Sequence, residues 1–398
     1  MIRFSDRLQR LPGYPLAEIP TIKRRLLEAG VDVIDLGAGD NDTPPPVVAV
    51  ETMTDALRNP ALSKYGFQQG LLEFRQAAAR WIERRFGHHF DPVTEILPLI
   101  GSKEGLSHLP LAVINPGDVA IVPEPGYQAY LGGALLSGAE PYVAPLKPEN
   151  EFLLELDQVP GAVLRRAKIA FVNYPNNPTA AVATPAYLDR TVALCRTHGI
   201  VLAYDNAYCE LTFDGYRAPS IFDTTGAEEI ALEFFSLSKS YSMTGWRLGF
   251  AAGRAELIGA LTRVKSYVDT GPFLAVQKAG VAALEHSDEL VAPIRSELQR
   301  RRDAAVAALR DHGFQVDAPK AAMYLWIPLP PGMPSASFAK HAMEQAGVVV
   351  LPGSAFGPAG EGFFRIALTV GADRLRAGAE RLGSVLEQLR RGPVATTA

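Results

Sequence analysis

The sequence predicts an α/β protein with a mainly parallel central sheet and a second, smaller α/β domain. Between about residues 94 and 253, short apolar runs alternate with helical patterns, which is typical of parallel strands joined by crossover helices. After Pro272 the pattern is helical for roughly forty residues and is then followed by shorter strand candidates. A chain of 398 residues is long enough for two domains that each bury a core.

The predicted strands are short apolar runs. In the large domain they occupy 96–100, 119–122, 169–173, 201–204, 231–235 and 248–252. In the C-terminal part they occupy 323–328, 348–351 and 363–368, after a helical region that Ser287-Asp288 interrupts. Ligands of parallel α/β sheets bind beyond the carboxyl ends of the strands, so the residues that follow each run are the candidates for a site.

The domain boundaries follow from where these patterns change. The N-terminal segment, 1–45, contributes no strand to the parallel sheet, and we expect it to pack with the small domain. We assign 46–285 to the large domain and 286–392 to the small C-terminal domain. Residues 393–398 lack periodicity and are expected to form a flexible tail.

Composition and charge narrow the partners to small molecules or a second copy of the chain. The net charge is −4 and the pI about 6.0, so we expect no basic surface for nucleic acid. No apolar run is long enough to predict a membrane span, and the N-terminus lacks the apolar stretch of a signal peptide. Two cysteines, Cys195 and Cys209, do not make a disulfide framework. We therefore expect a cytoplasmic protein, and we expect no metal.

Lys239 is the most informative residue of the chain, because it follows a predicted buried strand within the run Ser236-Leu237-Ser238-Lys239-Ser240. An amine beside a pocket at such a strand end loses water, which favours its neutral, nucleophilic form. Arg247 follows eight positions later. Together with the hydroxyls of Ser236 and Ser238, its guanidinium group could bind a phosphate. A nucleophilic lysine beside a phosphate anchor indicates pyridoxal phosphate held as a Schiff base.

Polar residues at three other strand ends have roles that the sequence leaves open. The run 101–105, Gly-Ser-Lys-Glu-Gly, opens a helix whose amides could face an anion, or its glycines serve the turn alone. Asn176 and Asn177 either cap a turn or donate to a ligand oxygen. Asp205 either caps a following helix or pairs with a pyridinium nitrogen. Since Asn177, Asp205 and Lys239 all follow strands, we expect them to converge over one crevice.

Four motifs occur in the order in which class I and II aminotransferases carry them, and the chain resembles that family over nearly its whole length. They are Tyr174-Pro175-Asn176-Asn177-Pro178-Thr179, Asp205-Asn206-Ala207-Tyr208, the segment 236–249, and Phe364-Arg365-Ile366. The resemblance implies the fold of pyridoxal-phosphate-dependent transferases of the aspartate aminotransferase type. One departure is Ala180, which stands where the family usually has glycine, and we expect it to alter only the turn.

The resemblance implies roles around the cofactor ring. Lys239 would form the Schiff base and, once displaced by substrate, carry the proton between substrate and cofactor. Asp205 would pair with the ring nitrogen, while Asn177 and Tyr208 would bond the phenolic oxygen. The aromatic ring of Tyr127 would stack on the cofactor.

The resemblance also implies a phosphate site shared between two subunits. Its members in one chain would be Ser102, Lys103, Ser236, Ser238 and Arg247. Tyr65 resembles the tyrosine that these enzymes lend to the phosphate of the neighbouring subunit, which implies a homodimer with shared active sites. Thr270 lies in a second segment that reaches across the interface in this family, or in a simple turn.

On the substrate side, the resemblance assigns the α-carboxylate to Arg365 as a two-pronged ion pair. The alternative for Arg365 is an internal salt bridge. Tyr14, Gly39 and Asn177 complete the substrate-binding set that the resemblance implies.

The substrate is indicated by a closer resemblance. The runs 97–105, 213–216 and 243–247 are similar to the LL-diaminopimelate aminotransferase branch, although Gln68 stands where some members place a glutamate. We predict transamination between LL-2,6-diaminopimelate, in lysine biosynthesis, and 2-oxoglutarate, with glutamate as the other product. An alanine or broad-specificity aminotransferase and a pyridoxal-phosphate-dependent C–S β-lyase remain alternatives, because they would share the same residues. A transcription regulator would need an added DNA-binding module, for which the chain has no spare length.

Overall fold

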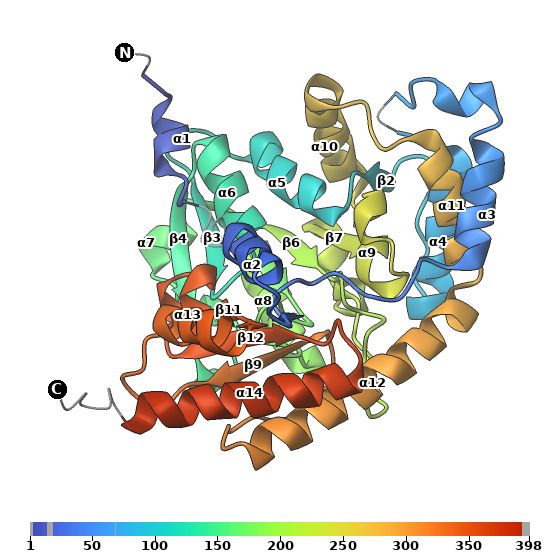
Figure 1. Cartoon of the computed structure of the whole chain (residues 1–398). Helices are drawn as coiled ribbons and strands as arrows, with labels where there is room; N and C mark the ends of the chain where they lie inside the picture. The colour runs from blue at the N-terminus through green and yellow to red at the C-terminus, as the bar shows by residue number, and fades with distance from the viewer. Residues whose placement is uncertain (1–2, 14–18, 68, 392–398) are drawn as a thin grey trace.

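The computed structural model describes residues 3–13, 19–67 and 69–391, and it has the predicted α/β architecture (Figure 1). Its largest sheet has the strand order β2-β8-β7-β6-β5-β3-β4. All neighbouring strands in it are parallel except β8, which is antiparallel to both β2 and β7. The strands are β2 (Ile96–Leu99), β3 (Val119–Glu124), β4 (Glu140–Pro145), β5 (Ala167–Asn173), β6 (Val201–Asp205), β7 (Ala231–Ser236) and β8 (Gly249–Gly253).

The strand β4 is the one member of this sheet that the apolar runs did not predict. It lies at the edge of the sheet, and Ala144 is its only buried residue. An edge strand with exposed side chains needs no continuous apolar run. The other six strands agree with the predicted runs to within two residues at each end.

Helices cover both faces of the large sheet (Figure 1). The helices of this part are α3 (Val47–Ala56), α4 (Leu72–Phe86), α5 (Ser102–Val113), α6 (Gln128–Ser137), α7 (Gly161–Leu164), α8 (Pro185–His198), α9 (Leu237–Ser240), α10 (Ala255–Val268) and α11 (Leu274–Glu285). Side chains of β6 alternate between the two faces, as a strand requires. Ala203 packs in the core under α5, α6 and α10, whereas Leu202 and Tyr204 pack in the core under α7 and α8.

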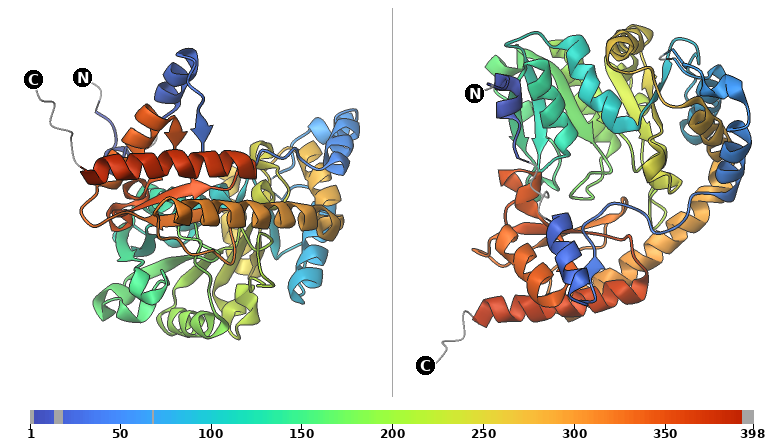
Figure 2. Two further views of the ribbon diagram at one scale, coloured as in Figure 1. Left: turned by 60° about the horizontal axis from the view of Figure 1, so that its bottom comes forward. Right: turned by 45° about the horizontal axis from the view of Figure 1, so that its top comes forward.

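The C-terminal part is built on a small antiparallel sheet and three helices. The sheet has the order β11-β12-β9, with β9 (Tyr324–Pro328), β11 (Leu351–Pro352) and β12 (Phe363–Ala367). The helices are α12 (Ser287–Asp311), α13 (Ser335–Ala346) and α14 (Ala372–Arg391). Figure 2 shows α12 running from the side of α11 to the small sheet. Accordingly, its Val291 packs in the core with α4 and α11, and its Leu298 packs in the core of the C-terminal part.

The N-terminal segment contacts both parts. β1 (Ile34–Asp35) pairs in parallel with β10 (Val348–Val349), and Asp32 forms ion pairs with Arg374 and Arg381 of α14. The helix α2 (Ile19–Glu28) precedes this strand, whereas α1 (Asp6–Arg10) lies against α6 of the large part. The boundaries at 45, 285 and 392 remain our proposal for how the chain divides.

Two expectations about the chain as a whole can be compared with the described residues. Both cysteines are buried and unpaired. Among the helices that the structure describes, none is long and apolar enough to cross a membrane. The tail at 393–398 lies outside the described residues.

Candidate active site

A cavity of about 430 Å³ lies where the large sheet, the small sheet and the N-terminal segment meet. Twelve of the residues predicted for the site line it: Gly39, Ser102, Lys103, Tyr127, Asn177, Asp205, Tyr208, Ser236, Ser238, Lys239, Arg247 and Arg365. Tyr65 lies outside this cavity and its side chain is exposed. Tyr14 and Gln68 lie outside the described residues.

Lys239 enters the cavity from α9, the short helix that begins directly after β7. Its Nζ donates a hydrogen bond to the backbone oxygen of Gly39, 2.7 Å away. A Cβ on Gly39 would lie only 2.7 Å from the hydroxyl of Tyr324, so glycine is required at this position for the close approach. The lysine amine is therefore held at the junction of the large sheet with the N-terminal segment.

Asp205 ends β6 and is buried beneath the cavity, with 4% of its surface exposed. Tyr130 donates a hydrogen bond to Oδ2 at 2.7 Å, while Oδ1 is buried and has no partner among the described residues. Burial raises the pKa of Asp205 to about 6, although the bond from Tyr130 acts in the opposite direction. The next helical element after Asp205 begins only at Ile221, so the helix-cap alternative is wrong. An unpartnered buried carboxylate oxygen requires a donor from a ligand or a proton.

Asn177 and Tyr208 line the same cavity as Asp205. The backbone nitrogen of Asn177 donates to Asn173 Oδ1 at 2.8 Å, which fixes the turn after β5, and its side-chain Oδ1 accepts from Arg365. The amide nitrogen of Asn177 is thus its remaining side-chain donor. The hydroxyls of Tyr208 and Tyr324 lie 3.1 Å apart, and burial raises the pKa of Tyr208 well above its ordinary value.

The turn after Asn177 contains Ala180 and is closed by backbone hydrogen bonds. Ala180 has φ 59°, in the left-handed region that favours glycine. Its backbone nitrogen nevertheless donates to Asn176 at 3.0 Å, and the nitrogen of Asn176 donates to Ala181 at 2.9 Å. The side-chain oxygen of Asn176 accepts from the nitrogen and hydroxyl of Thr179, so Asn176 stabilises the turn while Asn177 faces the cavity.

Cationic and hydroxyl groups gather at the end of the cavity where α5 begins. Ser102 and Lys103 form the first turn of α5, whose amides and dipole favour an anion. The guanidinium of Arg247 lies against Gly101, where a Cβ would be 2.5 Å from Nη2. Burial, and then the charge of Arg247, lower the pKa of Lys103. Ser236 and Ser238 complete the set, and the crowding of two cations calls for an anion between them.

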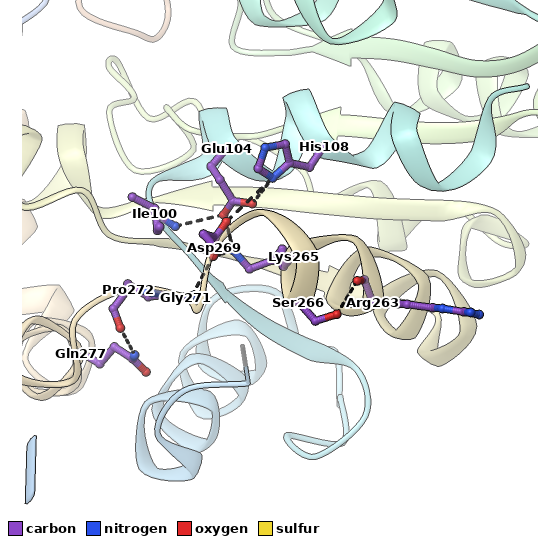
Figure 3. A network of polar contacts seen from close by, with 10 residues as sticks. All are labelled: Ile100, Glu104, His108, Arg263, Lys265, Ser266, Asp269, Gly271, Pro272 and Gln277. Atoms are coloured by element: carbon purple, nitrogen blue, oxygen red, sulfur yellow. Dashed lines mark hydrogen bonds and ion pairs between the residues drawn. The ribbon is translucent and has the colours of Figure 1, made fainter. Parts of the chain in front are cut away.

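A largely buried network of ion pairs stabilises the first turn of α5 (Figure 3). Glu104 Oε2 accepts from the backbone of Ile100 at 3.2 Å and from Lys265 Nζ at 2.6 Å. Lys265 is fully buried and also donates to Asp269 at 3.0 Å, and His108 Nδ1 lies 2.7 Å from Glu104 Oε1. Because Lys265 of α10 donates to both Glu104 and Asp269, the network links α5 to α10.

Arg365 enters from β12 with 5% of its surface exposed. Its Nη1 donates to Asn177 Oδ1 at 2.7 Å and its Nη2 to the backbone oxygen of Gly37 at 2.8 Å. Its guanidinium stacks on the Tyr324 ring, 4.0 Å from the centroid. Within the described part of the chain no carboxylate pairs with Arg365, so the internal salt bridge is wrong. Burial lowers the pKa of Arg365, and a buried cation without a counter-charge is a receptor for an anion.

Two residues that shape the site carry no signal in the sequence. Tyr130 holds Asp205, and Tyr324 contacts Tyr208, Gly39 and Arg365. Tyr130 lies in the helix α6 and Tyr324 in the strand β9, both among apolar residues, and their partners come from distant parts of the chain. Tyr127, which was predicted, precedes α6, and the amine of Lys103 lies 5.6 Å from the centroid of its ring.

Comparison with known proteins is consistent across sequence and structure. Residues 31–382 match the model of the family described as aminotransferase class I and II. The LL-diaminopimelate aminotransferase of Moorella thermoacetica is 47% identical over 96% of this chain and 98% of its own length, and that of Aquifex aeolicus is 46% identical over 96% and 99%. The substrate-bound structure of BacF from Bacillus subtilis superposes with a TM-score of 0.92, at 33% identity over 96% of this chain and 98% of its own.

Pyridoxal phosphate fits the groups in the cavity. Asp205 Oδ1 is a buried acceptor without a partner among the described residues, as a protonated ring nitrogen requires. Lys103 and Arg247, with the first turn of α5, suit the phosphate, and the amine of Lys239 suits the aldehyde. From the family match, the identity to its members and this fit, the chain belongs to the class I and II aminotransferases and is a pyridoxal-phosphate-dependent transaminase.

Proposed function

We propose that this enzyme exchanges an amino group between LL-2,6-diaminopimelate and 2-oxoglutarate, as a step of lysine biosynthesis. The observation that carries the proposal is the 46–47% identity, over 96% of the chain, to proteins named LL-diaminopimelate aminotransferases. The cavity supports it by presenting one buried arginine, Arg365, to a substrate carboxylate. Both proposed substrates carry an α-carboxylate, so the same arginine would serve each in turn.

We assign the chemical steps to four side chains. When bound, pyridoxal phosphate supplies the electron sink that lets the substrate α-carbon lose a proton. Lys239 holds the cofactor between turnovers and, when displaced by substrate, accepts and returns the α-proton through Nζ. Asp205 keeps a negative charge beside the ring nitrogen. Asn177 and Tyr208 donate to the ring oxygen, and Asn177 also orients Arg365 through the 2.7 Å bond.

Arg365 orients the substrate. Its Nη1 and Nη2 donate hydrogen bonds to Asn177 and Gly37, and the ring of Tyr324 stacks on the guanidinium and fixes the orientation of its plane. A planar guanidinium in a fixed orientation can grip a carboxylate through two parallel bonds. This grip sets the direction in which the α-hydrogen points, which is the condition for proton transfer to one amine. Ser102, Lys103, Ser236, Ser238 and Arg247 would hold the phosphate, Tyr127 would cover the ring, and Tyr14 and Gly39 would border the substrate.

We also propose a homodimer in which Tyr65 reaches the phosphate of the partner's site. Large apolar side chains remain exposed on segments that lie together around α3 and α11: Val47, Tyr65, Phe67, Tyr267, Val268 and Phe273. Tyr267 is 88% exposed and Tyr65 is 71% exposed, and such a cluster favours association with a second copy. Thr270 lies next to this cluster, in the second segment proposed to cross the interface.

The oligomeric state tests this arrangement. In light scattering, Phe67→Asp should shift the protein toward monomer and weaken cofactor binding, because the partner's tyrosine is withdrawn. Val93→Asp is the matched control, since Val93 is also an exposed apolar residue but is not one of the six in the cluster. A wild-type monomer with full activity would contradict the dimer.

We propose a cytoplasmic location, which agrees with two buried, unpaired cysteines.

The substrate proposal is tested with purified holoenzyme and a panel of donors. LL-diaminopimelate with 2-oxoglutarate should yield glutamate at a higher kcat/KM than alanine or aspartate. Efficient turnover of alanine without turnover of LL-diaminopimelate would contradict the substrate while leaving the family intact. Release of pyruvate and ammonia from cystathionine, faster than any transamination, would instead indicate the β-lyase.

A further inference from the structure

A second cavity, of about 450 Å³, lies apart from the active site, between α4, the segment 210–217 and the first half of α12. It is as large as the active-site cavity and within the range of small-molecule sites. Arginines from all three elements line it: Arg84, Arg85, Arg217 and Arg295.

The acids of this cavity are mostly engaged by other groups. Glu210 Oε1 lies 2.5 Å from Arg85 Nε, and both side chains are largely buried. Asp214 is held by Arg302, which is not part of the cavity, at 2.5 Å. The third acid, Asp288, is exposed at the start of α12.

The charges of three of these arginines, Arg84, Arg217 and Arg295, are not compensated by any carboxylate that the structure describes. Arg84 donates to the backbone oxygen of Leu284 at 2.7 Å, and Arg217 donates to the backbone oxygen of Arg85. In the part of the chain that the structure describes, neither of them nor Arg295 forms an ion pair with a carboxylate. The cavity therefore carries an excess of positive charge, with guanidinium groups supplied from different elements.

Arg85, which lines the cavity, also has a buried donor without a partner in the described part of the chain. Arg85 has only 14% of its side chain exposed, and its Nη1 is buried without a hydrogen-bond partner among the described residues. Its Nε and Nη2 are occupied by Glu210 and by the backbone oxygen of Cys209 at 3.1 Å. A buried charged donor left unpaired is costly, so Glu210 does not fully compensate the charge of Arg85.

The cavity lies where α12 passes from one core to the other. Val291 of α12 packs with α4, whereas Leu298 packs with the small sheet, and Arg295 lies between them. The segment 210–217 begins two residues after Tyr208 of the active site. A ligand that joined Arg84, Arg217 and Arg295 would thus bridge the two parts of the molecule.

We propose that this cavity is a second ligand site, which binds a small acid with at least two carboxylate or phosphate groups. Guanidinium groups match both oxyanions in a forked geometry, and several arginines from separate elements favour a multivalent anion over chloride. The site is separate from Arg365 and from the cofactor phosphate groups, so its occupation does not compete with either.

Calorimetric titration of the full-length holoenzyme tests the proposal, with citrate as the carboxylate probe and pyrophosphate as the phosphate probe at constant ionic strength. We expect a binding event that persists in Arg365→Lys and that leaves the visible absorbance of the cofactor unchanged. The double variant Arg217→Gln/Arg295→Gln should weaken it at least about tenfold, as the loss of a charge-assisted hydrogen bond does. The probe that binds more tightly identifies the ligand class.

The matched control is Arg165→Gln/Arg190→Gln, which removes the same charge from exposed positions elsewhere on the large part. This control should bind the probes as the wild type does. The proposal is overturned if neither probe binds at millimolar concentration, if Arg365→Lys alone abolishes binding, or if the two double variants behave alike. Unchanged cofactor absorbance and melting temperature in each variant establish that the fold is retained.

Discussion

Replacing Arg365 by lysine should weaken the reaction with both substrates by a similar factor. In the structure the guanidinium is buried, fixed by Asn177 and Gly37, stacked on Tyr324, and without a carboxylate partner among the described residues. Lysine keeps the positive charge but offers a single point of contact and cannot keep the planar orientation. The substitution thus isolates the two-pronged geometry from the charge.

The magnitude follows from the bonds that are lost. A charge-assisted hydrogen bond contributes about 1.5–3 kcal/mol, and a two-pronged grip loses one of them when a point charge replaces the fork. That difference corresponds to a decrease of roughly 10- to 150-fold in kcat/KM. The same decrease should appear with the amino donor and with the oxo-acid acceptor, because each presents its α-carboxylate to the same group.

Single-turnover measurements of the two half-reactions provide the assay, with the cofactor absorbance as the signal. Arg374→Lys serves as the control, because Arg374 donates two hydrogen bonds to an acid, Asp32, at the surface, as we propose that Arg365 does to the substrate. It should keep kcat/KM within about twofold, since exposed ion pairs contribute about 0–1 kcal/mol. A decrease below threefold in Arg365→Lys, or one confined to a single half-reaction, would refute the assignment.

Three further predictions concern buried charges. Glu233 is fully buried and its pKa is raised to about 8. The stability that its protonated form contributes is complete below the unfolded pKa and is lost as the pH rises through 8. The melting temperature should therefore fall less between pH 6 and 9 in Glu233→Gln than in the wild type, and an equal fall would contradict the raised pKa. We expect the apoenzyme of Asp205→Asn to melt at a higher temperature than the wild type at pH 8, because the substitution removes a buried carboxylate whose pKa is raised to about 6. Adding pyridoxal phosphate should raise the melting temperature of this variant less than that of the wild type. An undiminished rise would exclude Asp205 as the partner of the ring nitrogen. Lys265→Met leaves the carboxylates of Glu104 and Asp269 without their ammonium partner. It should lower the free energy of unfolding of the apoenzyme in urea by about 3–5 kcal/mol. A decrease below about 1 kcal/mol would show that the network is not needed for stability.

The strand ends account for what the sequence could predict. Asn177, Asp205 and Lys239 each follow an apolar run, and the parallel sheet places such positions at one edge. The strand pattern therefore predicts that they converge in one cavity. The family resemblance added Arg365, whose strand belongs to the other sheet. Local pattern and motif order were therefore sufficient for most of the site.

The residues that escaped prediction depend on contacts between distant segments. Tyr324 sits in an apolar strand, and only the folded chain brings its hydroxyl to Gly39 and Tyr208. Lys265 lies in an amphipathic helix where a lysine normally faces solvent, yet it is fully buried against Glu104. The strand β4 was missed because an exposed edge carries no apolar signal.

The amine that holds the cofactor can be identified directly, by borohydride reduction of the holoenzyme followed by peptide mass spectrometry. Two lysines line the cavity, Lys239 and Lys103. Burial lowers the pKa of Lys103, which favours a reactive neutral amine there, so Lys103 is the competing candidate. The geometry predicts a phosphopyridoxyl group on Lys239 and an unmodified Lys103. A label on Lys103, or no label on Lys239, would contradict the central assignment.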